Sequence, residues 1–116
     1  MNQLANVFKI LADENRLRMI VLLYQEELCV CELSGILDIP QPRVSQNLSR
    51  LRDLNLVDDV RKEKFVFYSL RRDSIILTDI LQHIIEDMDA YPQFIVDKSK
   101  LKDKSKYSNQ CCVIND

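Results

Sequence analysis

The sequence predicts a mainly helical α+β fold, in which short helices are followed by a β-hairpin and a long final helix. Three observations support this prediction. Apolar residues recur at helical spacing through most of the chain, glycine occurs only once in 116 residues, and residues 56–70 change to a strand-like pattern around a charged tip. The scarcity of backbone breakers argues against a loop-rich β-fold. The length fits one small domain.

Two helices are expected between the N-terminus and Gln25. The first apolar stripe consists of Leu4, Val7, Phe8 and Leu11. The second consists of Leu17, Ile20, Val21 and Tyr24. Residues three or four apart lie on one face of a helix, so each set gives its helix a face that can be buried.

A second pair of helices follows, joined by a tight turn. Residues 31–38 are expected to form a short helix that is closed by the turn Asp38-Ile-Pro40. Residues 41–54 form the next helix, because Pro42 suits its first turn. The inward positions of the two helices are Leu33, Ile36 and Leu37, then Val44, Leu48 and Leu51. The outer face of the second helix is polar.

A β-hairpin and a long helix complete the pattern. Strands over 56–60 and 65–70 flank the polar tip 61–64. Beyond Asp73, a candidate N-cap, one helix is expected to end near Tyr91-Pro92. Its apolar stripe consists of Ile76, Leu77, Ile80, Leu81, Ile84, Ile85 and Met88. Residues 92–116 are expected to form a C-terminal tail that carries Cys111 and Cys112, and its lysine-rich segment 98–106 is expected to be solvated.

Charge is unevenly distributed along the chain. Residues 41–72 carry eight Lys/Arg against four Asp/Glu, a balance of +4, in a chain whose net charge is −2. A local basic stripe on an acidic body suits a nucleic-acid partner better than the average charge suggests. Neither a membrane span nor an export signal is recognisable, so a cytoplasmic protein without membrane contact is expected. No catalytic set or phosphate-binding glycine loop is recognisable either, so neither an enzyme nor a permanent cofactor is expected.

The order helix, turn, helix, basic hairpin and apolar last helix defines a winged helix-turn-helix, and residues 1–91 are expected to form this DNA-binding and dimerisation domain. The second helix of such a pair enters the major groove, where polar side chains of its N-terminal half reach base edges. Basic side chains at the hairpin tip reach phosphates of double-stranded DNA. The candidate DNA-binding residues are Gln41, Arg43, Ser45, Gln46, Asn47, Arg50, Arg61, Lys62 and Lys64, with Arg52 as a further cation.

A homodimer through the N- and C-terminal helices is expected. A chain of this size buries only a modest core alone, and both terminal helices carry strongly apolar stripes. The candidate interface residues are Leu4, Val7, Phe8, Leu11, Ile76, Ile80, Leu81, Ile84 and Met88. The alternative is that both stripes cover only the core of a single chain.

Two segments resemble the ArsR/SmtB family of metal-responsive repressors. They are Glu27-Leu-Cys-Val-Cys-Glu-Leu33 and Gln41-Pro-Arg-Val-Ser-Gln-Asn-Leu48. The stretch Phe8–Arg18 and the hairpin end Phe67-Tyr-Ser-Leu70 are also similar to the family, so the resemblance covers roughly residues 3–90. It implies a dimeric repressor that leaves operator DNA when a metal, a metalloid or an oxidant reaches its sensor site.

Within that family, the segment Leu-Cys-Val-Cys31 resembles the arsenite, antimonite and cadmium/lead sensors. The resemblance implies that Cys29 and Cys31 are sensor thiols and that arsenite or antimonite is the inducer. The arsenic pattern usually has a third cysteine where this chain has Ser34, and a hydroxyl is a poor substitute for a thiolate. Cys111 and Cys112 are the only other thiols in the chain. They are therefore the candidates to complete the site, from the same or the opposite subunit.

Several alternatives stay open. Cadmium or lead could be held by sulfurs of both cysteine pairs, or an oxidant could cross-link Cys29 to a tail cysteine. The chain could also be a winged-helix interaction module without metal sensing, or Cys29 and Cys31 could simply pack as small apolar residues. A zinc site on the last helix is rejected. His83 and Glu86 match half of that family pattern, but Leu70 and Arg72 occupy the other half and cannot bind zinc.

The cysteine spacing suggests how an inducer acts. If Cys29 and Cys31 both lie on a regular helix, their side chains point about 200° apart. An atom bound by both would then unwind the first turn and deform the helix-turn-helix. We therefore expect inducer binding to shift the dimer between a state that binds DNA and one that does not.

Overall fold

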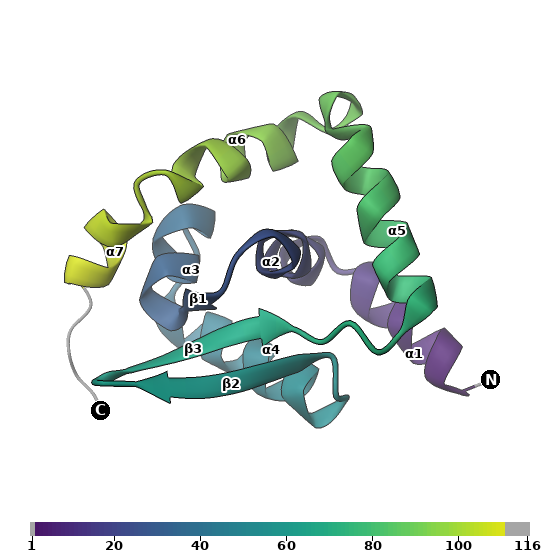
Figure 1. Cartoon of the computed structure of the whole chain (residues 1–116), viewed down its shortest axis with the longest axis horizontal. Helices are drawn as coiled ribbons and strands as arrows, with labels where there is room; N and C mark the ends of the chain where they lie inside the picture. The colour runs from purple at the N-terminus through teal and green to yellow at the C-terminus, as the bar shows by residue number, and fades with distance from the viewer. Residues whose placement is uncertain (1, 111–116) are drawn as a thin grey trace.

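The computed structural model describes the backbone of residues 2–110 and the side chains of residues 4–107. It confirms the predicted fold, a mainly helical chain with a β-hairpin (Figure 1). The helices are α1 (Asn2–Leu11), α2 (Glu14–Gln25), α3 (Val30–Leu37), α4 (Gln41–Asp53), α5 (Ile75–Glu86), the 3₁₀ helix η1 (Met88–Ala90), α6 (Pro92–Leu101) and α7 (Lys104–Gln110). The strands are β1 (Leu28–Cys29), β2 (Val57–Lys62) and β3 (Phe65–Leu70). No described helix is both long and apolar enough to cross a bilayer.

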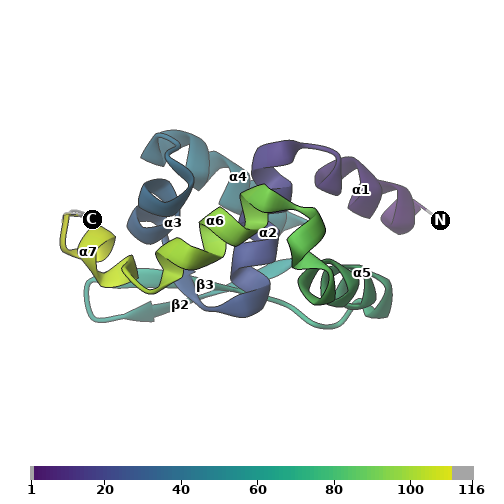
Figure 2. The same cartoon turned by 90° about the horizontal axis from the view of Figure 1, so that it is seen from above.

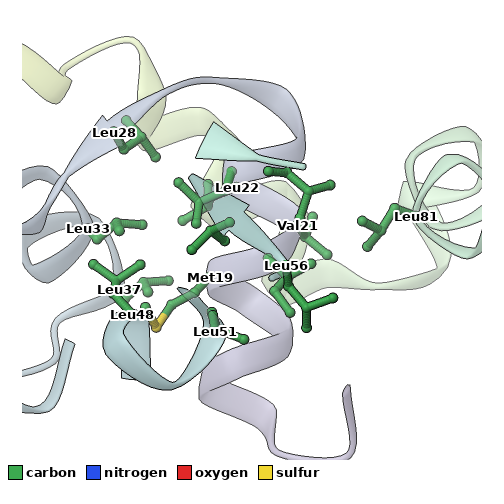
Figure 3. Packing of buried hydrophobic residues seen from close by; sticks show 14 of the residues in the cluster. Met19, Val21, Leu22, Leu28, Leu33, Leu37, Leu48, Leu51, Leu56 and Leu81 are labelled. Atoms are coloured by element: carbon green, nitrogen blue, oxygen red, sulfur yellow. The ribbon is translucent and has the colours of Figure 1, made fainter. Parts of the chain in front are cut away.

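Helix α2 forms the centre of the molecule. Its residues from Met19 to Leu23 are all buried, so this helix is covered on every side rather than along one stripe. Figure 3 shows Met19 close to Leu48 of α4, and Leu22 close to the core residues of the neighbouring elements. The N-cap residue Asp13 accepts a hydrogen bond from the N–H of Arg16 at 3.0 Å, which satisfies one of the free donors at the start of this helix.

The helix-turn-helix is formed by α3 and α4. Asp38 ends α3 in the left-handed region with φ of 58°, and the hydroxyl of Ser34 donates to the carbonyl oxygen of Ile39 in the turn. The apolar positions predicted for the two helices are buried, as expected. Ser34 therefore stabilises the turn before α4, at the position where the resemblance leads one to expect a thiol.

The sheet has three antiparallel strands in the order β1-β3-β2. The predicted hairpin is confirmed, with Lys62 opposite Phe65 and the turn at Glu63 and Lys64. The short strand β1 was not predicted. It pairs Leu28 with Tyr68 and Cys29 with Phe67, and thereby joins the segment before α3 to the wing.

The long final helix is shorter than predicted. Helix α5 ends at Glu86, and the separate turn η1 precedes Tyr91. Its N-cap is Ser74, whose hydroxyl accepts from the N–H of Leu77 at 3.2 Å, and not Asp73 as predicted. The Asp73 carboxylate instead pairs with Arg71.

The expectation that residues 98–106 form a solvated tail is wrong. Helices α6 and α7 pack against α2 and α3, and Phe94 and Leu101 belong to the main hydrophobic core. Figure 2 shows α6 crossing over α2, with α7 at the α3 end of the molecule. The Asp97 carboxylate, 2% exposed, accepts two hydrogen bonds from the Arg18 guanidinium at 2.9 and 3.0 Å. Most of the lysines in this segment lie on the outer side of the helices.

Candidate nucleic-acid interface and cysteine site

The outer face of α4 is polar and exposed. Burial of Val44, Leu48 and Leu51 fixes the rotation of this helix, because these residues face the core. The side chains of Gln41, Arg43, Ser45, Gln46 and Arg50 are exposed, and Asn47 is half-buried. The structure thus brings the predicted base-contacting residues together on one surface, beside the wing formed by β2 and β3 (Figure 1).

The cationic residues of this surface fall into two groups. Arg52 forms an ion pair with Asp59 at 2.9 Å, and Lys62 pairs with Glu27 and lies over the ring of Phe67, 5.5 Å from its centroid. The members of the second group are exposed and make no ion pair within the described residues. They are Arg43, Arg50, Arg61 and Lys64.

Cys29 and Cys31 form a small buried cluster against the wing. They are 2% and 7% exposed, and they pack against the partly buried rings of Phe65 and Phe67. Cys29 lies in β1 and also caps α3, and Cys31 lies in the first turn of that helix. The two side chains thus belong to one cluster.

This arrangement corrects the expected geometry of the switch. The two cysteines do not both lie on a regular helix, because Cys29 has extended backbone with φ of −95° and ψ of 172°. The angle of about 200° that holds for two such positions on one helix does not apply. The helical geometry from which unwinding of the first turn of α3 was expected is therefore absent.

The surroundings of Cys29 oppose its ionisation. Burial raises the pKa of the Cys29 thiol, and the nearby negative charge of Glu32 adds to the effect. The N–H groups of Cys31 and Glu32 offset only part of the rise. Glu32, 4% exposed, accepts a hydrogen bond from the N–H of Cys29 at 3.0 Å, which ties this carboxylate to the start of α3. The surroundings of Cys29 therefore favour the neutral thiol over the thiolate.

The cysteine cluster contacts both elements of the candidate DNA interface. The side-chain amide of Gln41, the first residue of α4, donates to the Sγ of Cys31 at 3.7 Å. On the other side, Phe65 and Phe67 belong to β3 of the wing. The Lys62–Glu27 pair adds a second link between the wing and the segment before β1.

Helix α7 covers the outer side of α3. Lys104 pairs with Glu26, and the ring of Tyr107 lies directly against Gly35. The predicted further ligands Cys111 and Cys112 lie outside the described residues. Within the described part of the chain, no group of three or more His, Cys, Asp or Glu side chains is arranged to hold a metal ion. His83 is exposed, in the last turn of α5.

The candidate dimer residues divide by exposure. Phe8 and Ile76 are 51% and 46% exposed, and the neighbouring Ile75, which was not predicted, is 75% exposed. Leu81 has no exposed surface and fills the core of its own chain, so its assignment to the dimer interface is wrong. Val7 and Met88 are also largely buried within the chain. The half-buried candidates are Leu4, Leu11, Ile80 and Ile84.

Some residues of the site were not found from the sequence. Glu32 follows Cys29 by three positions, which is the spacing of a capping box, so its contact could have been predicted. The contacts of Phe65 and Phe67 with the cysteines depend on the two-residue strand β1, which leaves no periodic pattern.

The fold and the exposed face of α4 together define a winged helix-turn-helix protein. Residues 13–59 match the family model described as bacterial regulatory protein, arsR family. Over these residues, about two fifths of the chain, it is similar to the ArsR family of bacterial regulatory proteins. Proteins of this family are DNA-binding transcriptional regulators and not enzymes, as the sequence predicted.

Two curated relatives illustrate the range of the family. The arsenic resistance transcriptional regulator ArsR1 of Pseudomonas putida is 48% identical over 65 residues, which cover 55% of this chain and 51% of the relative. The cadmium resistance regulatory protein CadC of Listeria innocua is 39% identical over 70 residues, which cover 60% of this chain and 59% of the relative. The chain thus spans only about half to three fifths of these relatives.

Solved structures agree with the fold. Reduced HlyU from Vibrio cholerae has a TM-score of 0.65 and 31% identity, and the match covers 72% of this chain and 85% of HlyU. A homodimeric winged helix-turn-helix DNA-binding domain from Mycobacterium bovis, described as a possible ArsR-family regulator, has a TM-score of 0.63 and 27% identity. That match covers 75% of this chain and 82% of the domain.

Proposed function

We propose that this chain is a homodimeric repressor that binds operator DNA through α4 and the wing and is released when arsenite or antimonite binds the thiols of Cys29 and Cys31. One observation carries the proposal. The buried cysteine cluster touches the first residue of α4 on one side and the aromatic side chains of the wing on the other. An atom bound by these sulfurs therefore lies between the two elements that contact DNA.

The raised pKa of Cys29 favours arsenite as the inducer. Arsenite is the neutral species As(OH)₃ at physiological pH. For each thiol bound, one As–S bond forms, one As–O bond breaks, and the thiol proton leaves with the hydroxide as water. The reaction releases no net proton, so a thiol whose pKa is raised by burial can take part in it without prior ionisation.

Cadmium is the competing inducer, since both arsenic and cadmium regulators are among the relatives. A divalent soft cation binds thiolates and releases the thiol protons to solvent. The raised pKa of Cys29 opposes this release at neutral pH. We therefore place cadmium and lead second to arsenite and antimonite.

Cys111 or Cys112 is our proposed third thiol, because trivalent arsenic binds three sulfurs and Ser34 already donates its hydroxyl within the turn. Both cysteines follow α7 in the chain, and α7 packs on α3, which carries Cys31. We further propose that the exposed apolar side chains of α1 and α5 form the dimer interface, in line with the homodimeric relative. The cytoplasm, where thiols stay reduced, is the proposed place of action.

A titration of DNA affinity tests the inducer. A duplex that the reduced protein selects from a random pool serves as the operator, and fluorescence anisotropy gives Kd with arsenite or cadmium at pH 6.5 and pH 8. We expect arsenite to release the DNA equally at both pH values, and cadmium to act more strongly at the higher pH. Release by cadmium alone would contradict the arsenite assignment, and indifference to both would contradict the thiol switch.

A further inference from the structure

We propose that Arg52 is a positioning residue for DNA binding, whose ion pair with Asp59 holds the wing at the angle to α4 that the operator requires. This inference rests on the DNA-binding part of the proposed function, because it concerns how the two elements that contact DNA are held relative to each other. It gives Arg52 a role other than the phosphate contact that its charge suggests.

The ion pair joins the last turn of α4 to the wing. The Arg52 guanidinium donates to the carboxylate of Asp59, the third residue of β2, at 2.9 Å. Among the described side chains, no other ion pair or side-chain hydrogen bond connects α4 with β2 or β3. Their remaining side-chain contacts are apolar, and apolar contacts are not directional. The pair is therefore the directional side-chain contact between the two elements.

The backbone of Arg52 is held as well. Asn55 has a positive φ of 61°, and its N–H donates to the carbonyl oxygen of Arg52 at 2.9 Å. The N–H of Leu56 donates to the carbonyl oxygen of Leu51, also at 2.9 Å, which completes a Schellman motif at the end of α4. Strand β2 begins two residues after Asn55. With its carbonyl in this turn and its guanidinium on Asp59, Arg52 bridges the junction between α4 and β2.

The acceptor of the pair belongs to the paired part of the sheet. Asp59 lies opposite Tyr68 of β3, and Tyr68 also lies opposite Leu28 of β1. Burial raises the pKa of the Tyr68 hydroxyl, the negative charge of Asp59 adds to this rise, and the positive charge of Arg52 offsets part of it. Arg52 therefore holds the wing where its strands are paired with each other, and not at the hairpin tip.

The sign of the charge on Asp59 makes the proposal testable. A carboxylate in the wing repels the phosphates of DNA, so electrostatics alone predicts that its removal strengthens DNA binding. If the ion pair positions the wing, its removal weakens DNA binding instead. The reason is that a protein whose binding-competent arrangement is less populated has a proportionally weaker apparent affinity. The two accounts thus predict opposite changes in Kd.

A double-mutant cycle on DNA affinity tests the pair. Fluorescence anisotropy gives Kd for the selected operator duplex over a range of salt concentrations, for wild type, Arg52→Gln, Asp59→Asn and the double variant. An exposed ion pair changes an equilibrium by up to about five-fold, so we expect each single variant to bind about two- to five-fold more weakly. The double variant should bind no more weakly than either single variant. The salt slope of Arg52→Gln should change by much less than the value of about one that a phosphate contact contributes.

The matched control is Asp58→Asn, the same substitution at the preceding position of β2. The Asp58 side chain is 61% exposed, and its ion pair, 3.9 Å from Arg71, does not involve α4. This variant should not weaken DNA binding. The side chains of Arg52 and Asp59 are 50% and 35% exposed, so all variants should fold, and circular dichroism checks this.

The outcomes separate this inference from the proposed function. If Asp59→Asn binds DNA as tightly as wild type or more tightly, the ion pair does not position the wing. If Arg52→Gln lowers the salt slope by about one unit, Arg52 is a phosphate contact. Additive losses in the double variant would mean that the two side chains act separately. These three results leave the proposed function intact, whereas a wild type that binds no duplex overturns both.

Discussion

The Cys29 thiol lies where burial and the Glu32 carboxylate both oppose a negative charge, and its cluster with Cys31 adjoins the wing. The raised pKa of the thiol makes the stability of the protein depend on pH. The ion pairs of the nearby lysines affect how each lysine contributes to DNA binding. Both Lys62 and Lys64 are exposed at the hairpin tip, but Lys62 is paired with Glu27, while Lys64 makes no ion pair within the described residues. Chemically similar side chains should therefore contribute differently to DNA binding.

Alkaline pH should destabilise the free protein partly through Cys29. A thiol whose pKa is higher in the folded chain than in the unfolded chain contributes stability below the unfolded pKa of about 8.5. That contribution is lost as the pH rises through the folded pKa. Urea unfolding of reduced protein from pH 7 to pH 10 should show a steeper loss of unfolding free energy for wild type than for Cys29→Ala. Parallel curves would contradict the raised pKa.

The salt dependence of DNA binding should distinguish Lys64 from Lys62. Each phosphate contact contributes about one unit to the slope of log Kd against log salt concentration. Lys64→Gln should therefore lower this slope by about one unit. Lys62→Gln should change the slope less, because Lys62 must break its ion pair with Glu27 and its contact with the ring of Phe67 before it can bind a phosphate. Equal slopes for the two variants would mean that the Lys62–Glu27 pair is lost when DNA binds.

At the scale of elements, helices with a strong apolar periodicity were predicted well. Elements that depend on partners far away in the sequence were not. Helices α3 and α4 lie close to their predicted bounds, because Val44, Leu48 and Leu51 leave a clear pattern. Helix α6 was missed although Phe94, Asp97 and Leu101 share the same kind of spacing. The density of lysines in residues 98–106 had suggested a solvated tail in place of a helix. Asp97 can be buried only because Arg18, 79 residues away, pairs with it, and no local pattern reveals that partner.

The docking of α7 on α3 should depend on Gly35. A Cβ at this position would lie 2.1 Å from Cδ1 and 2.8 Å from Cβ of Tyr107, so α7 must move. Such overpacking costs about 1–3 kcal/mol. The higher helix propensity of alanine returns up to about 1 kcal/mol. We expect Gly35→Ala to lower the unfolding free energy and to speed the cleavage by trypsin at the lysines of 98–106, which already lie on the outer side of folded helices.

The control for that experiment is Tyr107→Ala, which removes the same contact from the other side. The two effects should be less than additive in the double variant, because both act on one contact. Full additivity, or unchanged proteolysis of Gly35→Ala, would show that the docking of α7 on α3 does not depend on the contact between Gly35 and Tyr107.

At the scale of the whole molecule, α7 and the tip of the wing lie at one end, while α1 and α5 both lie toward the other (Figures 1 and 2). Exposed Phe8, Ile75 and Ile76 mark that second end as the proposed dimer face. The sequence predicted the helices that carry this face. It could not separate their outward residues from inward ones such as Leu81, because both lie on one broad apolar stripe.

Dimerisation should be sensitive to charge at this face. Ile75→Asp places a carboxylate where the side chain is 75% exposed in the single chain, so a monomer tolerates it and a dimer does not. Sedimentation velocity should give the 13.6 kDa monomer for Ile75→Asp and twice that mass for wild type. The control variant Ile95→Asp, on the exposed side of α6, should stay dimeric. A monomeric wild type, or a dimeric Ile75→Asp, would contradict the proposed interface.

The most direct test of the thiol switch is the release of operator DNA by arsenite, measured by fluorescence anisotropy on reduced wild type and on Cys29→Ser. A serine hydroxyl keeps nearly the same size but binds arsenic far less well than a thiol. We expect both proteins to bind DNA and only wild type to be released by arsenite. If Cys29→Ser is released as readily as wild type, or if neither protein responds, the buried cysteine cluster is not the arsenite sensor.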